Sequence, residues 1–288
     1  MKQIKINNND RPENWKDFFG QTKIINNLKV IIESSIKENK QIDHILIHGG
    51  SGMGKTSLAI LISKVANKKI HILNVSALQK PSDLIAVLTT IKEGEFIFID
   101  EINAVEKELI ETLYPVLEDG YINLIIGKEY NSKIVHVKLP SFTMITASTE
   151  ITKIAKPFLN RFPIHVQLEP YNIENITCII QNKAYKTEIN INPNECSYLA
   201  LYARKTPRIA ISLMNRLFDY FVVKKISDFS KNSIDVVLNN LDIHKFGLTN
   251  IDMNYLNLLM KRQPLGLETL SQIMNLPFAT ISNNIEHS

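Results

Sequence analysis

The sequence predicts an α/β protein whose larger part is a doubly wound parallel sheet, followed by smaller helical domains. A short apolar run at residues 44–48 breaks into a glycine-rich stretch, and another apolar run at residues 96–99 ends in two acidic residues. Strand patterns stop near residue 170, and beyond it apolar residues recur at helical spacing. Because strands alternate with helices before that point, we expect a parallel sheet with helices on both faces.

The glycine-rich stretch fits the phosphate-binding template G-x-x-x-x-G-K-[ST], with Gly49, Gly54, Lys55 and Thr56 at its fixed positions. Glycines allow positive φ and turn successive backbone N–H groups toward a polyphosphate, and the following helix adds its positive dipole end. We expect Lys55 to reach the β- and γ-phosphates and the Thr56 hydroxyl to bind Mg²⁺. An ordinary glycine-rich turn is the alternative, but the apolar strand before the stretch and the helix after it favour a phosphate loop. The predicted nucleotide site also includes Gly52 and Ser57.

The order of elements follows from hydrophobic periodicity. Apolar residues at helical spacing predict helices at residues 24–32, 58–65 and 109–117. Apolar runs predict strands at residues 44–48, 70–75, 96–99, 143–147 and 164–168. A proline and a capping residue mark a further helix start at residues 80–83.

A hairpin interrupts this alternation, because residues 121–127 and 134–139 are rich in β-formers and are joined by a polar segment. Its apolar segment 124–126 either contacts a partner protein or packs on its own sheet. After residue 170, two helical stripes predict a small helical domain. We therefore expect an ATPase-type α/β domain at residues 1–170, a helical domain at 171–243 and a third unit at 244–288.

Composition sets broad limits on function. The 288 residues exceed the usual size of one domain, and 44% hydrophobic with 22% charged residues is ordinary for a soluble protein. A net charge of +4 permits a polyanionic partner without requiring one. No membrane span or secretory signal is evident, so we expect a cytoplasmic protein. Cys178 and Cys196 form no metal or disulfide motif and are expected to act as small buried hydrophobes.

Two acidic residues complete the chemistry expected at the nucleotide. Asp100 is placed to hold Mg²⁺, and Glu101 to orient and deprotonate the attacking water. The alternative is a polar pair that merely ends a strand at a solvated edge. Thr149 follows the strand at 143–147, where its hydroxyl could sense the γ-phosphate, although such a threonine is often only a surface residue.

Two arginines are candidates for charge stabilisation. Arg161 is a candidate arginine finger for the site of a neighbouring subunit, or else a surface salt-bridge residue. Arg208 starts a helix of the second domain and could contact the nucleotide from the opposite side.

These residues, taken in order, resemble the RuvB family, the AAA+ ATPases that drive branch migration of Holliday junctions in bacterial recombination and repair. The resemblance covers nearly the whole chain, from about residue 11 to about residue 286. It rests on the phosphate loop and on the motifs Arg11-Pro12, Gly20-Gln21, Phe98-Ile99-Asp100-Glu101-Ile102, Leu113-Tyr114-Pro115, Glu118-Asp119, Ile125-Ile126-Gly127-Lys128, Arg161-Phe162 and Thr206-Pro207-Arg208-Ile209-Ala210.

The resemblance implies a homo-hexameric motor that hydrolyses ATP with Mg²⁺ on double-stranded DNA at four-way junctions. It implies that the hairpin at 121–139 docks RuvA, the junction-binding partner, and that residues 171–243 form a lid and residues 244–288 a winged helix. It places Arg161 in the neighbouring subunit's site. Nucleotide contacts of the family would fall on Arg11, Pro12, Tyr171, Pro207 and Arg208, with Glu118 and Asp119 nearby.

The sequence departs from the family at three places. Asn103 stands where the family has a histidine and Glu150 where it has an arginine, which puts the coupling between subunits in question. The sequence also stops where the family continues into an arginine-bearing wing, so we expect a winged helix truncated before the wing. Lysines and arginines supply most non-specific DNA affinity, so weak duplex binding with a flat salt dependence is expected.

Two alternative functions remain at this stage. One is a clamp-loader-like AAA+ ATPase, which the lack of a zinc-type cysteine set disfavours. The other is a nucleotide-dependent oligomeric switch or scaffold with little hydrolysis, which Asn103 and Glu150 motivate. A GTPase is disfavoured because the sequence has no N-K-x-D segment for reading the base.

Overall fold

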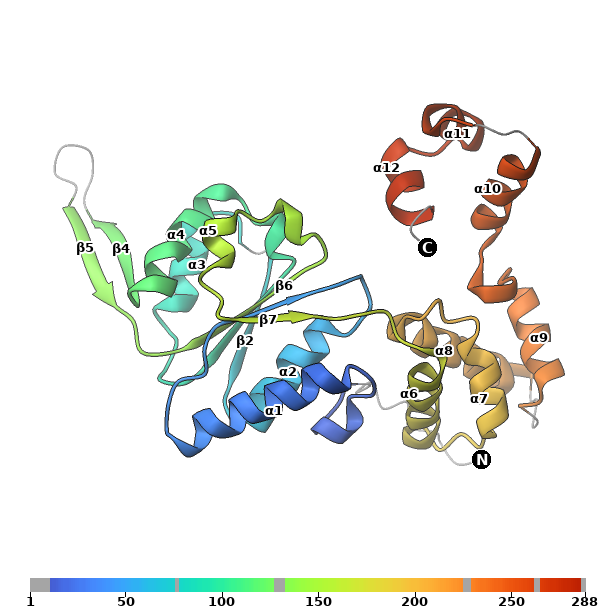
Figure 1. The fold of residues 1–288 in the computed structure, drawn as a ribbon, viewed down its shortest axis with the longest axis horizontal. Coiled ribbons are helices and arrows are strands. Elements are labelled where there is room, and N and C mark those ends of the chain that lie inside the picture. The colour runs from blue at the N-terminus through green and yellow to red at the C-terminus, as the bar shows by residue number, and fades with distance from the viewer. Residues whose placement is uncertain (1–10, 76–77, 127–132, 225–228, 262–264, 286–288) are drawn as a thin grey trace. The chain divides into compact units, whose positions relative to one another are not determined.

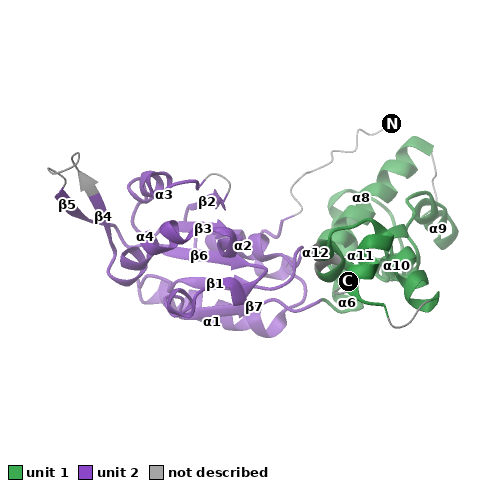
Figure 2. Cartoon of the chain, turned by 90° about the horizontal axis from the view of Figure 1, so that it is seen from above, with its two compact units in different colours: residues 1–10, 171–288 green, residues 11–170 purple. Residues whose placement is uncertain are grey.

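The computed structural model describes residues 11–75, 78–126, 133–224, 229–261 and 265–285. The chain divides into two compact units (Figure 2), one formed by residues 11–170 and the other, among the described residues, by residues 171–285. In the described part of the chain, no helix is long and apolar enough to cross a membrane.

The first unit is built on a five-stranded parallel sheet in the order β2-β3-β6-β1-β7 (Figure 2). Its strands are β1 (Ile45–His48), β2 (Ile70–Asn74), β3 (Phe96–Asp100), β6 (Thr143–Ser148) and β7 (Ile164–Gln167). The three inner strands β3, β6 and β1 are apolar along almost their whole length, as is expected when helices cover both faces. The predicted doubly wound sheet is confirmed.

Helices pack on both faces of this sheet. One face carries α1 (Thr22–Lys37) and α2 (Lys55–Val65), and the other α3 (Pro81–Leu88), α4 (Lys107–Glu118) and α5 (Lys156–Leu159) (Figure 1). Helix α1 buries Ile25, Leu28 and Ile32, which are spaced three and four apart, whereas Ile24 and Ile31 of the predicted stripe are only half-buried. The second face forms one core in which β3 residues Ile97 and Ile99 meet apolar residues of α3, α4 and α5.

The predicted hairpin is an antiparallel pair of β4 (Tyr121–Ile126) and β5 (Lys133–Lys138), separate from the main sheet. Leu124 is partly buried and packs against the core of the α/β unit, whereas Ile134 is 64% exposed. The segment 127–132 and the side chains of Ile125 and Ile126 lie outside the described residues.

The second unit begins with a helical domain. Its helices are α6 (Ile173–Lys186), α7 (Pro193–Ala200), α8 (Pro207–Lys224) and α9 (Lys231–Asn240). Helix α6 begins at the N-cap Asn172, whose side chain accepts from the Asn175 N–H, and prolines occupy the first position of α7 and α8. Cys196 is buried as predicted, but Cys178 is only half-buried, which corrects the expectation that both cysteines are core residues.

The C-terminal part of the second unit packs α10 (Asn250–Lys261), α11 (Leu267–Met274), α12 (Phe278–Thr280) and a helical turn at Ile281–Ile285 around a small core of Tyr255, Leu270, Ile281 and Ile285. Arg204, just before α8, joins this part to the helical domain. Its Nε donates to the Gly247 carbonyl at 2.8 Å, and its guanidinium pairs with the buried Asp252. Gly247 has φ of 76°, and a Cβ there would clash with the Tyr202 carbonyl, so the junction requires glycine.

Candidate active site

The glycine-rich stretch lies at the carboxyl end of β1, between β6 and β7. Gly49, Gly52 and Gly54 all have positive φ, at 147°, 76° and 100°. A Cβ on Gly49 would lie 2.6 Å from the Leu168 carbonyl oxygen, so no other residue fits there without displacing β7. Gly54 is the N-cap of α2 and leaves the first N–H groups of that helix facing the loop. The stretch is thus built to bind an anion with its backbone.

Lys55 begins α2 and is only 6% exposed. Its ammonium donates to the carbonyl oxygens of Gly49 at 2.8 Å and Gly50 at 3.1 Å, and lies 3.9 Å from Glu101 Oε1. The cation therefore lies across the loop that would hold the phosphates. Bound phosphate oxygens could replace the two carbonyls as acceptors of the Lys55 ammonium. The new hydrogen bonds would be stronger because both partners would be charged.

Thr56 and Asp100 meet across the gap between α2 and β3. The Thr56 hydroxyl donates to Asp100 Oδ2 at 2.7 Å. Magnesium takes oxygen ligands at about 2.1 Å in an octahedron, which places neighbouring ligands roughly 2.9 Å apart. The hydroxyl and carboxylate oxygens are of the right kind and close to this spacing, so the pair fits a Mg²⁺ site.

Glu101 follows β3 in the left-handed conformation, with φ of 52°. Its Oε2 accepts two hydrogen bonds from Thr149, one from the hydroxyl at 2.7 Å and one from the backbone N–H at 3.1 Å. The predicted base and the predicted sensor therefore touch directly. A non-glycine residue costs about 1 kcal/mol in this conformation, which the surrounding contacts must offset.

A second side-chain bridge lies beside this pair and was not found by sequence reasoning. Ser148, fully buried at the end of β6, donates its hydroxyl to Asn103 Oδ1 at 2.7 Å and accepts from the Glu150 N–H at 3.0 Å. Asn103 lies in the 3₁₀ turn Ile102–Ala104. The sequence marks Asn103 as a departure from the RuvB-family pattern, but its partner Ser148 carries no sequence signal.

The N-terminal segment is tied to the same edge of the sheet. The Gln21 side chain donates to the Glu169 carbonyl at 2.6 Å and accepts from the Glu169 N–H at 3.2 Å. Glu169 directly follows Leu168, the residue after β7 that lies against Gly49. Of the residues predicted to contact the nucleotide in this segment, Arg11 is exposed and Pro12 is buried.

Arg161 lies at the opposite edge of the sheet. It precedes β7, whose Ile164 pairs with Ile45 and whose Gln167 pairs with His48. Gly49, the first residue of the phosphate loop, comes four residues after Ile45. At 3.3 Å per residue the loop therefore starts roughly 13 Å beyond the level of Ile45 and Ile164. Arg161 therefore lies far from the phosphate loop of its own chain along the strand direction.

Arg161 is held firmly at this edge. Its guanidinium donates to the Pro157 carbonyl at 2.5 Å and to Glu118 Oε2 at 2.6 Å, and lies 4.8 Å from the centre of the Tyr114 ring. Glu118 and the exposed Asp119 at the end of α4 thus lie with Arg161 and not with the phosphate loop.

The remaining predicted residues lie in the second unit. The Tyr171 N–H donates to the Lys205 carbonyl at 3.1 Å, which ties the buried Tyr171 to the segment that leads into Pro207 and the exposed Arg208. These residues gather at the starts of α6 and α8.

Electrostatics keep a neighbouring histidine uncharged. Burial, and then the nearby His165 and Lys55, lower the pKa of His48, which directly precedes the loop. The lowered pKa favours the neutral form of His48 beside the Lys55 ammonium.

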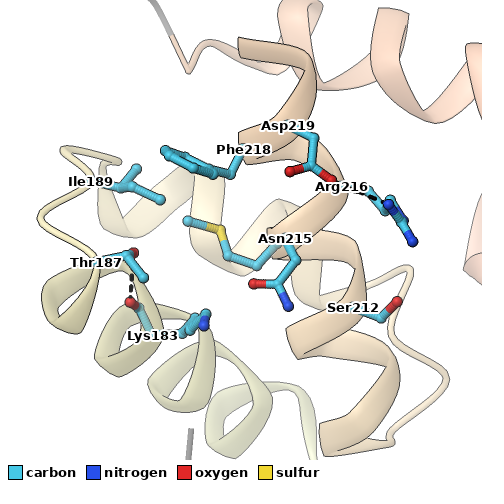
Figure 3. Close-up of a pocket in the computed structure, with 9 residues that line it drawn as sticks. Lys183, Thr187, Ile189, Ser212, Asn215, Arg216, Phe218 and Asp219 are labelled. Carbon is cyan, nitrogen blue, oxygen red and sulfur yellow. Dashed lines mark hydrogen bonds and ion pairs between the residues drawn. The ribbon is translucent and has the colours of Figure 1, made fainter. Parts of the chain in front are cut away.

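A pocket of about 260 Å³ lies between α6 and α8 within the second unit (Figure 3). The buried Lys183 and the exposed Asn215 and Arg216 contribute to its wall. It contains none of the residues predicted from the sequence.

Comparisons with known proteins agree along the whole chain. Residues 10–168 match the Holliday junction DNA helicase RuvB P-loop domain, residues 171–244 the RuvB AAA lid domain and residues 245–288 the RuvB C-terminal winged helix domain. The chain is 40% identical over 279 residues to the Holliday junction branch migration complex subunit RuvB of Mycoplasmopsis synoviae, covering 96% of this chain and 88% of that protein. It is also 40% identical over 285 residues to the subunit of the same name from Ureaplasma parvum, covering 98% and 89%. The solved structure of the Thermotoga maritima RuvB Holliday junction branch migration motor superimposes with a TM-score of 0.83 at 28% identity, covering 96% of this chain and 89% of that one.

Proposed function

The chain belongs to the RuvB family of P-loop AAA+ ATPases, and from this premise we propose that it is the ATP-hydrolysing motor subunit of Holliday junction branch migration. The observation that carries the proposal is the set of contacts at the carboxyl edge of the sheet. The contacts there join Lys55 to Glu101, Thr56 to Asp100 and Glu101 to Thr149, and they support a site for nucleotide hydrolysis.

In this proposal ATP binds with its phosphates in the glycine loop, and Lys55 turns from the loop carbonyls to the β- and γ-phosphates. Thr56 and Asp100 would hold Mg²⁺, and a bound Mg²⁺ would supply charge neutralisation at the phosphate oxygens. Glu101 orients the attacking water and accepts its proton. Thr149 connects Glu101 to the γ-phosphate side of the site, so it is suited to report whether the phosphate is present.

The family resemblance leads us to expect a hexameric ring of identical subunits. In such a ring Arg161 would act in the site of a neighbouring subunit. Arg161 cannot serve its own loop because it lies at the opposite edge of the same sheet. A neighbouring copy that presents its phosphate loop to this edge would receive the guanidinium already oriented by Glu118 and Tyr114. Arg161 would then stabilise transition-state charge in the neighbour's site. Glu118 and Asp119 would approach the neighbour's nucleotide from the same edge.

The second unit would contribute residues to nucleotide binding and would contact DNA. Tyr171, Pro207 and Arg208 would contact the nucleotide from the lid, together with Arg11 and Pro12 of the N-terminal segment. Because Arg204 bonds to the C-terminal part of its unit, movement of the lid would be passed on to that part. Residues 245–288 contain three basic residues, Lys245, Lys261 and Arg262, and three acidic residues, Asp252, Glu268 and Glu286, so duplex binding should be weak and insensitive to sequence.

The hairpin formed by β4 and β5 would dock the junction-binding partner. Ile134 and Val135 of β5 are exposed and would supply apolar contact area. The partner would hold the four-way junction, and a duplex arm of that junction would pass through the ring.

The test is ATP turnover measured with the chain alone, with four-way junction DNA, with the junction-binding partner, and with all together. We expect the highest turnover when all are present and movement of the junction only in that mixture. Glu101→Gln should abolish both while still binding nucleotide.

A mixing experiment tests the ring. Adding Arg161→Ala chains to wild type should lower turnover more than dilution by inactive chains does, whereas Arg216→Ala, which alters an exposed arginine paired with Asp219 on α8, should leave turnover unchanged. A loss no larger than dilution in the Arg161→Ala mixture, or turnover that survives Glu101→Gln, contradicts the proposal.

A further inference from the structure

The loops that follow β3 and β6 carry Glu101 and Thr149, and the sheet itself does not hold them together. The last register pair between the two strands is Ile99 with Thr146. Beyond it the backbone ladder ends, so the distance between Glu101 and Thr149 depends on side chains.

Two side-chain bridges take over from the ladder. The first is the pair of hydrogen bonds from Thr149 to Glu101 Oε2. The second runs from the Glu150 N–H to the Ser148 hydroxyl and from that hydroxyl to Asn103 Oδ1, at 3.0 and 2.7 Å. Ser148 is fully buried, so its hydroxyl has no access to bulk water as an alternative partner.

The second bridge fixes the backbone on both sides of Thr149. Ser148 precedes it and Glu150 follows it, and both are bound to the same hydroxyl oxygen. Asn103 anchors that oxygen from the loop after β3, two residues beyond Glu101. The Thr149 N–H is thereby aimed at Glu101.

We propose that Asn103, acting through Ser148, is a positioning residue that sets the contact between Thr149 and Glu101 and thereby the orientation of the Glu101 carboxylate for hydrolysis. Asn103 Oδ1 accepts from the Ser148 hydroxyl, and that hydroxyl in turn accepts from the Glu150 N–H next to Thr149. This assignment rests on the proposed function of Glu101 in ATP hydrolysis.

The test is a double-substitution cycle with Asn103→Ala, Ser148→Ala and both together. Each single variant should lower kcat for ATP about 10- to 100-fold, the range seen when a supporting hydrogen bond of an active site is lost. The binding of ADP should change less than about threefold, because Lys55 and the glycine loop are untouched. The double variant should be no slower than the slower single variant, since both remove one bridge.

Two controls separate this role from a fold defect. Asn26→Ala on the exposed side of α1 should leave kcat unchanged. Asn103→Asp keeps an acceptor for the Ser148 hydroxyl and should recover part of the lost kcat, which a variant with a collapsed loop would not do. Thermal unfolding identifies any variant whose slower turnover reflects loss of folded protein.

The outcomes are distinct from those that test the proposed function. Additive losses in the double variant, or full kcat in Asn103→Ala, overturn the positioning role while wild-type turnover still stands. A wild-type chain that hydrolyses no ATP with junction DNA and partner overturns the proposed function and this role with it.

Discussion

The two edges of the main sheet are built in opposite ways. At the carboxyl edge, where β1, β3 and β6 end, the polar groups of Lys55, Glu101 and Thr149 bond to each other or to the carbonyls of the glycine loop. At the amino edge, where β1, β6 and β7 begin, the rings of His44 and Phe162 lie in a chain of aromatic contacts that continues through Phe142, Phe158 and Tyr114.

The difference lies in what holds each functional cation. Lys55 bonds to carbonyls of the loop it serves, and a phosphate can replace them. Arg161 stacks on Tyr114 at the end of the aromatic chain and pairs with Glu118. In the proposed function, the Lys55 contacts change when a nucleotide binds whereas Arg161 stays in place, so substitutions at the two edges should affect activity and stability differently.

The largest effect is expected at the carboxyl edge. Lys55→Ala should reduce ATP turnover about 10³-fold, because one preorganised charge at a phosphate contributes several kcal/mol to the transition state. The free energy of unfolding should change by less than about 1 kcal/mol. The loop carbonyls that accept from Lys55 can bond to water once the side chain is gone. Turnover assays with urea unfolding of the same samples check both. A large loss of stability would contradict the comparison.

The reverse pattern is expected from Phe162→Ala at the amino edge. Phe162 is 1% exposed and contacts both Phe158 and His44, so its truncation should lower the free energy of unfolding by about 3 to 4 kcal/mol. The affinity of the remaining folded protein for ADP should be unchanged, since the loop lies at the other edge. Urea titration and nucleotide titration measure the two quantities, and a variant with normal stability but weak ADP binding would reverse the argument.

Acid should weaken the amino edge through His44. Burial lowers the pKa of His44 to about 4, and its Nδ1 accepts from the Met144 N–H. The unfolded chain, with an ordinary histidine pKa near 6.5, takes up the proton first as the pH falls. Stability should therefore drop between about pH 6.5 and pH 4, by about 3 kcal/mol from this residue.

His44→Gln keeps an acceptor for the Met144 N–H and removes the titration. Its unfolding free energy should fall less over the same interval, with the remaining slope partly due to His48, whose pKa is also lowered. Parallel pH curves for wild type and His44→Gln would show that His44 is not responsible.

The smallest effect is expected from the contact that orients Arg161. Tyr114→Leu removes the ring 4.8 Å from the guanidinium but leaves the bond to Glu118. An exposed cation–π contact contributes about 0.5 to 1 kcal/mol, so turnover of the assembled protein should fall about two- to fivefold. A loss as large as that of Arg161→Ala would mean that Tyr114 has a further role.

Local patterns account for the elements at both edges, but not for their contacts. The glycine template, the acidic pair after β3 and the hairpin could be predicted because each depends on residues close in sequence. The role of His44 could not, because its partners Phe142 and Phe162 are about 100 residues away and approach only when β1 lies between β6 and β7. The same holds for Gln21 with Glu169 and for Asn103 with Ser148.

The sequence by itself determined the parallel α/β class, the phosphate loop and the family, because hydrophobic period, glycine placement and ordered motifs are properties of short segments. Only the tertiary structure decided which groups share an edge. The strand order β2-β3-β6-β1-β7 places Glu101 against Thr149, and the parallel register of β7 with β1 sends Arg161 to the opposite edge. That separation, roughly 13 Å or more along the strands, is why the proposed role of Arg161 requires a neighbouring copy of the chain.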